Sequence, residues 1–216
     1  MKKIITLLAL VFISAAAFAV DNIDTPYYKI KWSIFENMPK NEGEIVFVGD
    51  SLTDYVKFDE LVPELRIRNR GIAGDTTVGV LNRLDEVISL KPSKLFLLIG
   101  TNDIVFNREP DEIVSNIAKI LATIREQSPN TVIYVQTLFP VNHSFGDSRR
   151  PPETILAINS KIAKLADEMK LTLIDTYSLF AEDDTLPERY TVDGIHLNGA
   201  GIVRWVEFLS PWLNER

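Results

Sequence analysis

Five short apolar runs, separated by segments with helical spacing, constrain the fold of this chain more than any other feature. Four of the runs lie at residues 44–48, 95–99, 131–135 and 171–174, and a weaker one lies at 67–69. Runs of this length and apolarity are typical of strands buried on both faces of a parallel sheet. Glycines stop the first and third runs, at Gly49 and Gly100. The sequence therefore predicts five buried strands.

Helical spacing fills the gaps between these runs. Isoleucines recur at intervals of four, three and four residues from Ile113 to Ile124, after Pro110 and two acidic residues that suit a first turn. Similar spacing predicts helices around residues 80–87, 155–169 and 201–208, and a short outer helix within residues 20–43. Strands that alternate with helices form a parallel sheet covered on both faces. We predict an α/β fold and, because no linker or repeat divides residues 20–216, a single domain.

Composition removes several function classes. The 216-residue chain has no cysteine, which excludes disulfide frameworks, thiolate metal sites and cysteine nucleophiles. It has two histidines, His143 and His196, too few for a His-rich metal cluster. The net charge of −7 argues against broad binding of nucleic acid.

The first 19 residues have the pattern of a secretory signal peptide. Lys2 and Lys3 precede a short apolar run, and Ala17-Phe18-Ala19 fits the small-x-small cleavage rule. The run is short for a membrane span, although an uncleaved N-terminal anchor remains the alternative. We expect an exported protein, periplasmic or secreted, with no membrane insertion after cleavage.

The segments that follow the strands carry the candidate chemistry, because ligands of parallel sheets bind beyond the carboxyl ends of the strands. Ser51 follows the first strand and would begin a helix, where backbone N–H groups favour developing negative charge. Of the two histidines, His196 has an acid, Asp193, three residues earlier, which could hold its Nδ1–H. The sequence therefore predicts Ser51 as nucleophile, His196 as base and Asp193 as its orienting acid.

Such a site also needs hydrogen-bond donors for an oxyanion. The N–H of Ser51 is one candidate, and Gly74, on the loop after the second strand, is another. Asn102, after the third strand, can add its side-chain amide. Considered one at a time, each residue has a simpler interpretation: Gly74 as a turn residue, and Asn102 as a helix cap or turn former.

These segments together resemble the SGNH hydrolases, also called GDSL-type lipases and esterases. The similar segments are Gly49-Asp50-Ser51-Leu52, Gly71-Ile72-Ala73-Gly74-Asp75-Thr76, Gly100-Thr101-Asn102-Asp103 and Asp193-Gly194-Ile195-His196-Leu197. The resemblance implies a flavodoxin-like, three-layer α/β/α sandwich around a five-stranded parallel sheet. It also implies serine catalysis without a metal or organic cofactor, with the roles proposed above for Ser51, His196, Asp193, Gly74 and Asn102.

The segment from Gly74 to Thr77, with Leu90-Lys91-Pro92 and Gly100-Thr101-Asn102, is most similar to the platelet-activating-factor acetylhydrolase-like branch. That branch includes bacterial esterases that remove small acyl groups, often acetyl, from sugars and glycans. We therefore expect a small-molecule or glycan ester as substrate. Lysophospholipase or thioesterase activity is an alternative, although such members usually have a second glycine where Thr101 stands.

Four further residues are candidates for contact with the substrate: Asp50, His143, Arg149 and Arg150. The arginine pair precedes Pro151 and reads most simply as a solvated loop pair. The functional reading is a guanidinium that binds a carboxylate on the substrate, such as that of an acetylated sialic acid. His143 is expected at the rim of the site.

Three other interpretations compete with a serine esterase. A metal-dependent phosphoesterase could use Asp50, Asp75, Asp103 and Asp193, although two-metal hydrolases usually also need several histidines. The α/β-hydrolase elbow G-x-S-x-G fails because Thr53 stands in place of its last glycine. A non-catalytic glycan-binding protein on the same fold is the alternative from another class.

Overall fold

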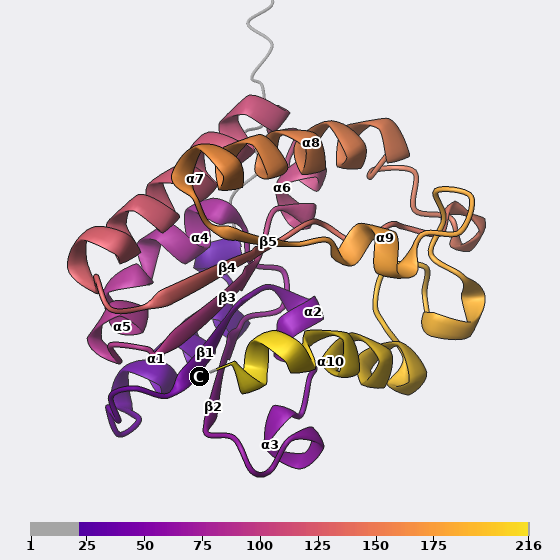
Figure 1. Cartoon of the computed structure of the whole chain (residues 1–216). Helices are drawn as coiled ribbons and strands as arrows, with labels where there is room; N and C mark the ends of the chain where they lie inside the picture. Colours follow the sequence, from indigo (N-terminus) through magenta and orange to yellow (C-terminus); the bar gives the residue numbers. More distant parts are fainter. Residues whose placement is uncertain (1–21, 216) are drawn as a thin grey trace, which may run out of the picture.

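The computed structural model describes residues 22–215 and shows a five-stranded sheet between two layers of helices (Figure 1). The strands are β1 (Ile45–Gly49), β2 (Ile67–Gly71), β3 (Lys94–Leu98), β4 (Val132–Gln136) and β5 (Thr172–Ile174). They lie in the order β2-β1-β3-β4-β5, and every neighbouring pair is parallel. The predicted α/β fold with five parallel strands is confirmed. The predicted signal peptide, residues 1–19, lies outside the described residues, and the domain limits of 20–216 stay a prediction.

Helices cover both faces of the sheet (Figure 1). The longer helices are α1 (Pro26–Asn37), α7 (Pro110–Gln127), α8 (Pro152–Met169) and α10 (Gly199–Asn214). The shorter ones are α2 (Ser51–Asp54), α3 (Phe58–Leu61), α4 (Thr77–Asn82), α5 (Leu84–Ser89), α6 (Thr101–Val105) and α9 (Thr176–Phe180), with 3-10 turns η1 (Asn22–Asp24), η2 (His143–Phe145) and η3 (Glu188–Tyr190). Helices α4, α5, α7 and α8 lie on one face, and α2, α3 and α10 on the other, as right-handed crossovers require.

A ladder of aromatic rings fixes the position of α10 on the sheet. Phe47, Phe96 and Tyr134 are in register on β1, β3 and β4, and their ring centroids lie 4.6 Å apart at each step. Trp205 of α10 is completely buried and stands edge-on against Phe47. Because α10 follows His196 in the chain, this packing positions His196 relative to β1.

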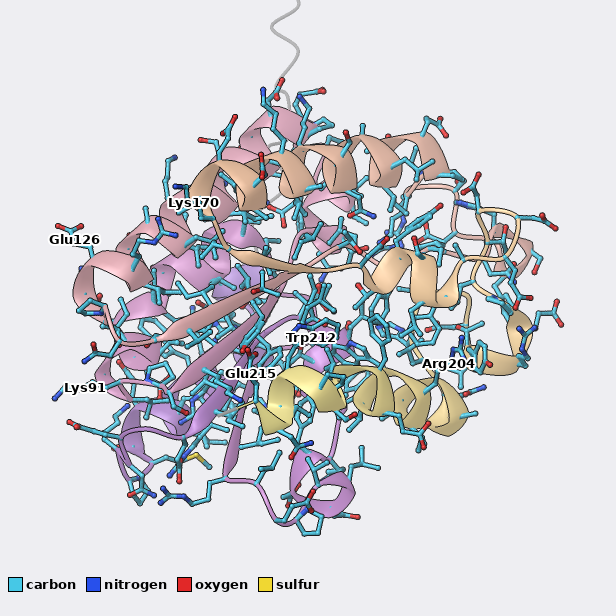
Figure 2. All side chains as sticks on the ribbon, in the orientation of Figure 1. Lys91, Glu126, Lys170, Arg204, Trp212 and Glu215 are labelled. Carbon is cyan, nitrogen blue, oxygen red and sulfur yellow. The ribbon has the colours of Figure 1, made fainter. Side chains whose placement is uncertain are left out.

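The far end of α10 is also tied to the sheet. The Lys94 ammonium, at the start of β3, donates to the backbone carbonyls of Trp212 at 2.7 Å and Leu213 at 3.0 Å. A cation at these carbonyls neutralises the negative end of the helix. Figure 2 labels Trp212 and Glu215 at this end of α10, and shows Lys91, Glu126 and Lys170 at the surface of the molecule.

Two predicted helices differ in extent from the observed ones. The helix predicted around residues 80–87 is interrupted at Arg83, whose guanidinium turns inward to the buried Asp75 carboxylate. The last helix starts at Gly199 and runs beyond the predicted end at 208, because it continues through Pro211 for one more turn. In this last turn Pro211 removes a single backbone hydrogen bond.

Candidate active site

Ser51 lies at the carboxyl end of the sheet, at the point where β1 turns into α2. The Asp50 carboxylate accepts the Leu52 N–H at 2.9 Å and so caps α2. A side chain at Gly49 would meet Thr53 Oγ1 at 2.3 Å and the Leu98 carbonyl at 2.5 Å, so only glycine fits this turn. The Ser51 side chain ends 2.8 Å from Nε2 of His196.

His196 lies on the loop between η3 and α10, with Asp193 beside it. Its Nδ1 is 2.6 Å from Asp193 Oδ2, while Oδ1 of the same carboxylate accepts the backbone N–H groups of His196 at 2.8 Å and Ile195 at 3.0 Å. Burial acts to raise the pKa of Asp193, but these hydrogen bonds outweigh it and lower the pKa below its ordinary value. The carboxylate is therefore ionised and fixes the imidazole ring in one orientation.

The predicted oxyanion donors follow β2 and β3. Asp75 N–H donates to the Ile72 carbonyl at 3.0 Å, which closes a tight turn with Gly74 at φ +80°, a value that favours glycine. The turn is anchored where Ala73 N–H donates to Asp54 at 2.9 Å. The Asn102 amide, in the first turn of α6, donates one hydrogen to the Asp75 carbonyl at 2.9 Å. An amide nitrogen has two hydrogens, so this bond leaves the second for a ligand.

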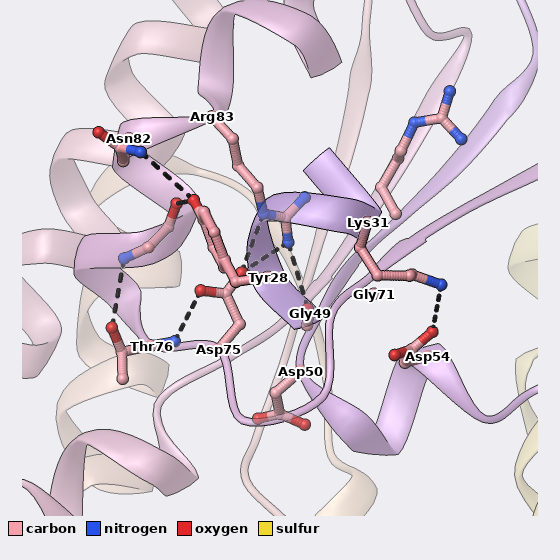
Figure 3. Close-up of polar contacts among 12 residues, drawn as sticks. Tyr28, Lys31, Gly49, Asp50, Asp54, Gly71, Asp75, Thr76, Asn82 and Arg83 are labelled. Atoms are coloured by element: carbon pink, nitrogen blue, oxygen red, sulfur yellow. Dashed lines mark hydrogen bonds and ion pairs between the residues drawn. The ribbon is translucent and has the colours of Figure 1, made fainter. Parts of the chain in front are cut away.

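A buried ion pair between Arg83 and Asp75 stabilises these loops from inside the protein (Figure 3). Arg83 binds Asp75 through Nη2 at 2.8 Å and Nε at 2.9 Å, and also donates to the Gly49 carbonyl at 3.3 Å. Both partners of the ion pair are almost completely buried. Because Asp75 lies beside Gly74 and Gly49 precedes Asp50, this one guanidinium holds the end of β1 and the loop after β2 together.

The structure corrects the prediction that Asp50 contacts substrate. The residue is only 1 % exposed, and its side chain caps α2 by accepting the Leu52 N–H. Burial raises the pKa of Asp50 to about 7, and the nearby carboxylates of Asp75 and Asp103 act in the same direction. Asp50 is therefore a buried structural group of the site.

The structure also corrects the interpretation of Arg150 as a solvated loop side chain. The residue is 5 % exposed, which rules out a solvated loop side chain. Its guanidinium donates to the Thr101 carbonyl, to Asp147 and to the Asn102 side chain, and its contact with a substrate carboxylate stays a prediction. Arg149 is exposed and pairs with Asp147 at 3.2 Å. Its contact with substrate stays a prediction.

His143 is partly buried in η2, and its Nδ1 lies 2.6 Å from the backbone carbonyl of Asp147. The neighbouring Asn142 N–H donates to the Gly194 carbonyl at 2.8 Å, which places η2 beside the loop of Asp193 and His196. The predicted rim position of His143 and its contact with substrate stay predictions.

Sequence reasoning missed Tyr55. Its ring centroid lies 5.4 Å from that of His196, and the residue is 54 % exposed. The signal was available, since Tyr55 comes four residues after Ser51, a spacing that places two residues on one side of a helical turn. An exposed aromatic ring therefore borders the predicted base.

The four aspartates of the metal alternative have partners of their own. Asp50 accepts the Leu52 N–H, Asp75 binds Arg83, Asp103 accepts from both the N–H and the hydroxyl of Thr77, and Asp193 binds His196. Across residues 22–215, no three His, Asp or Glu side chains are grouped so that they could hold a metal ion. Nor does this part of the chain contain a helix long and apolar enough to span a bilayer.

Comparison with known protein families shows which family the chain belongs to. Residues 47–202, most of the chain, match the model of the GDSL-like lipase/acylhydrolase family. The chain belongs to this family. It is thus a GDSL-family acylhydrolase, an enzyme that hydrolyses esters, and the predicted resemblance is confirmed.

This acylhydrolase is similar to individual curated proteins and, in fold, to solved structures. It is 29 % identical over 171 residues to the human platelet-activating factor acetylhydrolase IB subunit alpha2, covering 76 % of this chain and 72 % of the relative. A GDSL-like lipase of Bacteroides thetaiotaomicron has the same fold, with a TM-score of 0.76 and 22 % identity, over 86 % of this chain and 96 % of the other. The acetylxylan esterase of Geobacillus stearothermophilus superimposes with a TM-score of 0.65 and 21 % identity, over 83 % and 98 % of the two chains.

Proposed function

We propose that this acylhydrolase is a serine esterase that removes small acyl groups, above all acetyl, from hydroxyl groups of sugars or glycans. The observation that carries the proposal is the continuous hydrogen-bonded chain from Ser51 through His196 to Asp193, with distances of 2.8 and 2.6 Å. Three side chains in this order have the geometry of a nucleophile, its base and the acid that orients the base.

The reaction follows from that geometry. Ser51 Oγ attacks the ester carbonyl carbon while His196 Nε2 takes its proton, and the anionic Asp193 stabilises the imidazolium that forms. The carbonyl oxygen becomes an oxyanion that accepts hydrogen bonds from the N–H groups of Ser51 and Gly74 and from the Asn102 amide. When the C–O bond to the alcohol breaks, His196 gives its proton to the leaving oxygen. A water then loses a proton to His196 and attacks the acyl-serine. When the bond between the acyl carbon and Ser51 Oγ breaks, His196 returns the proton to Oγ, which releases the acid and free Ser51.

Two observations support the small acyl group and the sugar. Among the relatives of comparable length, the platelet-activating factor acetylhydrolase subunits bear the name of an acetyl-removing enzyme. The exposed ring of Tyr55 beside His196 offers a flat apolar surface next to the reacting alcohol. A pyranose ring presents a flat face of C–H groups that would bury apolar area against such a ring.

Export is part of the proposal. The basic start, apolar run and Ala17-Phe18-Ala19 of the first 19 residues support delivery to the periplasm or the medium, where acetylated glycans are accessible.

The testing experiment measures kcat/KM for p-nitrophenyl acetate, butyrate and octanoate, and acetate release from acetylated xylo-oligosaccharide and an O-acetylated sialic acid. We expect the acetate ester to be the best of the series, with at least a tenfold lower kcat/KM, about 1.4 kcal/mol, for the octanoate. Ser51→Ala should lower kcat by about 10³-fold or more, and a fluorophosphonate should label Ser51. Ser33→Ala, at an exposed serine of α1, is the matched control and should keep full activity.

Other outcomes point elsewhere. Equal or faster turnover of the octanoate would indicate a lysophospholipase or thioesterase of the same family. Binding of an acetylated glycan without any hydrolysis would indicate a glycan-binding protein.

A further inference from the structure

The guanidinium of Arg150 is buried directly beside the predicted oxyanion donor Asn102. Its side chain is 7 % exposed, and its three nitrogens all have protein partners. Nε donates to the Thr101 carbonyl at 3.2 Å, Nη1 binds the Asp147 carboxylate, and Nη2 donates to Asn102 Oδ1 at 3.0 Å. Two of these three bonds go to consecutive residues at the start of α6.

The hydrogen bonds around the Asn102 amide fix its orientation, with Nδ2 toward Asp75 and Oδ1 toward Arg150. On one side Nδ2 donates to the Asp75 carbonyl at 2.9 Å, and on the other Oδ1 accepts from Arg150. A flipped amide would set its oxygen against the Asp75 carbonyl and its nitrogen against a guanidinium, so that two acceptors and two donors would meet. The pair of contacts therefore permits a single orientation of the amide.

We propose that Arg150 is a positioning residue that holds the Asn102 amide with its N–H toward the oxyanion. The inference rests on the proposed function, since it assigns Arg150 a part in that same reaction. A donor that is already aligned stabilises the developing charge without reorganising in the transition state. An amide free to rotate would present its oxygen, an acceptor, to the oxyanion for part of the time.

The loop before Arg150 is folded in a way that fits this role. Asp147, whose side chain is 8 % exposed, holds Nη1 of Arg150 and also accepts the backbone N–H of Arg149 at 2.9 Å. The backbone carbonyl of Asp147 in turn lies 2.6 Å from His143 Nδ1. The ionic contact thus anchors the guanidinium from the side opposite Asn102, and a planar fork suits several acceptors at fixed angles better than an ammonium does.

The test is a double-mutant cycle between Arg150 and Asn102 with p-nitrophenyl acetate. Asn102→Ala should lower kcat by about 10²- to 10³-fold, the usual effect of losing one oxyanion donor. Arg150→Gln should lower kcat by about tenfold or more and leave KM within about twofold, while Arg150→Lys should lose less. In the Asn102→Ala background, Arg150→Gln should cause no further loss of kcat beyond about twofold.

A second measurement is the rate of inactivation by diethyl p-nitrophenyl phosphate, whose adduct with Ser51 also bears a tetrahedral centre. This rate should fall in parallel with kcat.

The matched control is Arg125→Gln. Arg125 is exposed at the end of α7, where the chain enters the opposite end of the sheet, and it too donates to a backbone carbonyl, that of Met169. This variant should keep kcat and KM. If Arg150→Gln does not fold, as judged by circular dichroism and Tm, Arg150→Lys and Asp147→Asn take its place in the cycle.

Three results would overturn the inference: unchanged kcat in the Arg150 variants, an equal loss in the Asn102→Ala background, or a change confined to KM. The last would indicate that Arg150 binds substrate. Ser51→Ala separates this failure from failure of the proposed function. If Ser51→Ala is inactive and the Arg150 variants are normal, only the positioning role is wrong; if Ser51→Ala is active, the esterase mechanism itself is wrong.

Discussion

At the scale of single residues, Asp50 is a carboxyl group that the fold keeps protonated up to about neutral pH. Burial raises its pKa from 3.8 to about 7. Between about pH 4 and 7 the folded state therefore binds more protons than the unfolded state, so this contribution to stability is complete below pH 4 and is lost as the pH rises through 7.

Asp50→Asn should remove that pH dependence. Asparagine still offers an oxygen to cap α2 but does not titrate. Relative to the variant, the free energy of unfolding of the wild type should fall by up to about 1.4 kcal/mol per pH unit between pH 4 and 7, and then level off. Urea unfolding of both proteins at several pH values measures this difference. A difference that stays constant across that range would contradict the buried, protonated Asp50.

The residues of the site differ in how far the sequence predicts them. Asp193 and His196 are three residues apart, so their contact is local and readable from the sequence. Ser51 and His196 are 145 residues apart in the sequence, and what predicts their contact is the need of a serine nucleophile for a base rather than any local pattern. Arg150 reaches Asn102 across 48 residues, and its loop sequence resembles a solvated one. Burial of this kind depends on how loops from different strands pack, which a single sequence does not encode locally.

At the scale of elements, helix α4 depends on a glycine. A Cβ at Gly79 would lie 1.8 Å from Asp75 Oδ1 and 3.0 Å from its Cγ. The Tyr28 hydroxyl also donates to the Gly79 carbonyl at 2.7 Å, so α1 fixes this backbone from the other side. The close approach of α4 to the Asp75–Arg83 ion pair is therefore possible only without a side chain at this position.

Gly79→Ala should destabilise the protein by about 2 kcal/mol or more, although alanine is the better helix former by about 1 kcal/mol. The methyl group must displace the Asp75 carboxylate from Arg83, which leaves buried charges poorly paired. Gly199→Ala is the control, because a Cβ there meets nothing within 4 Å in the first turn of α10. Thermal and urea unfolding compare the two, and a Gly79→Ala protein as stable as the control would refute the argument.

The same elements show why boundaries are harder to predict than the presence of a helix. Apolar spacing predicts one helix across residues 80–87. The observed chain forms two, α4 and α5, because Arg83 turns inward between them to form an ion pair with the buried Asp75 carboxylate. The short helix α6 after Gly100 has too few turns to show a helical period. The predicted strands lie within two residues of the observed ones. Apolar runs mark four of the five, whereas β2 has the sequence Ile-Arg-Asn-Arg-Gly and is only weakly apolar.

At the scale of the whole molecule, the site combines segments that are far apart in the sequence. Ser51 follows β1, whereas His196 and Asp193 precede α10. Trp205 of α10 connects that helix to the sheet. Its indole packs edge-on against Phe47 of β1 and Phe139 after β4, and its Nε1–H donates to Gln136 at 2.9 Å. The position of the base relative to the nucleophile thus depends on how α10 sits on the sheet.

Trp205→Leu should lower the free energy of unfolding by about 3–5 kcal/mol, a large share of the 5–15 kcal/mol typical of a domain. The cavity left by the indole accounts for most of this cost, and the buried Gln136 oxygen loses its donor.

Trp212→Leu is the matched control, since Trp212 is only partly buried near the end of the same helix, and its substitution should cost about 1 kcal/mol (Figure 2). Because the loop of His196 leads directly into α10, kcat of the folded Trp205→Leu protein should also fall, while that of Trp212→Leu should not. Urea unfolding and ester hydrolysis at a temperature where both variants are folded measure the two effects. If Trp205→Leu lost stability but kept full kcat, the loop of His196 would be held in place without α10, and the coupling between the core and the site would be wrong.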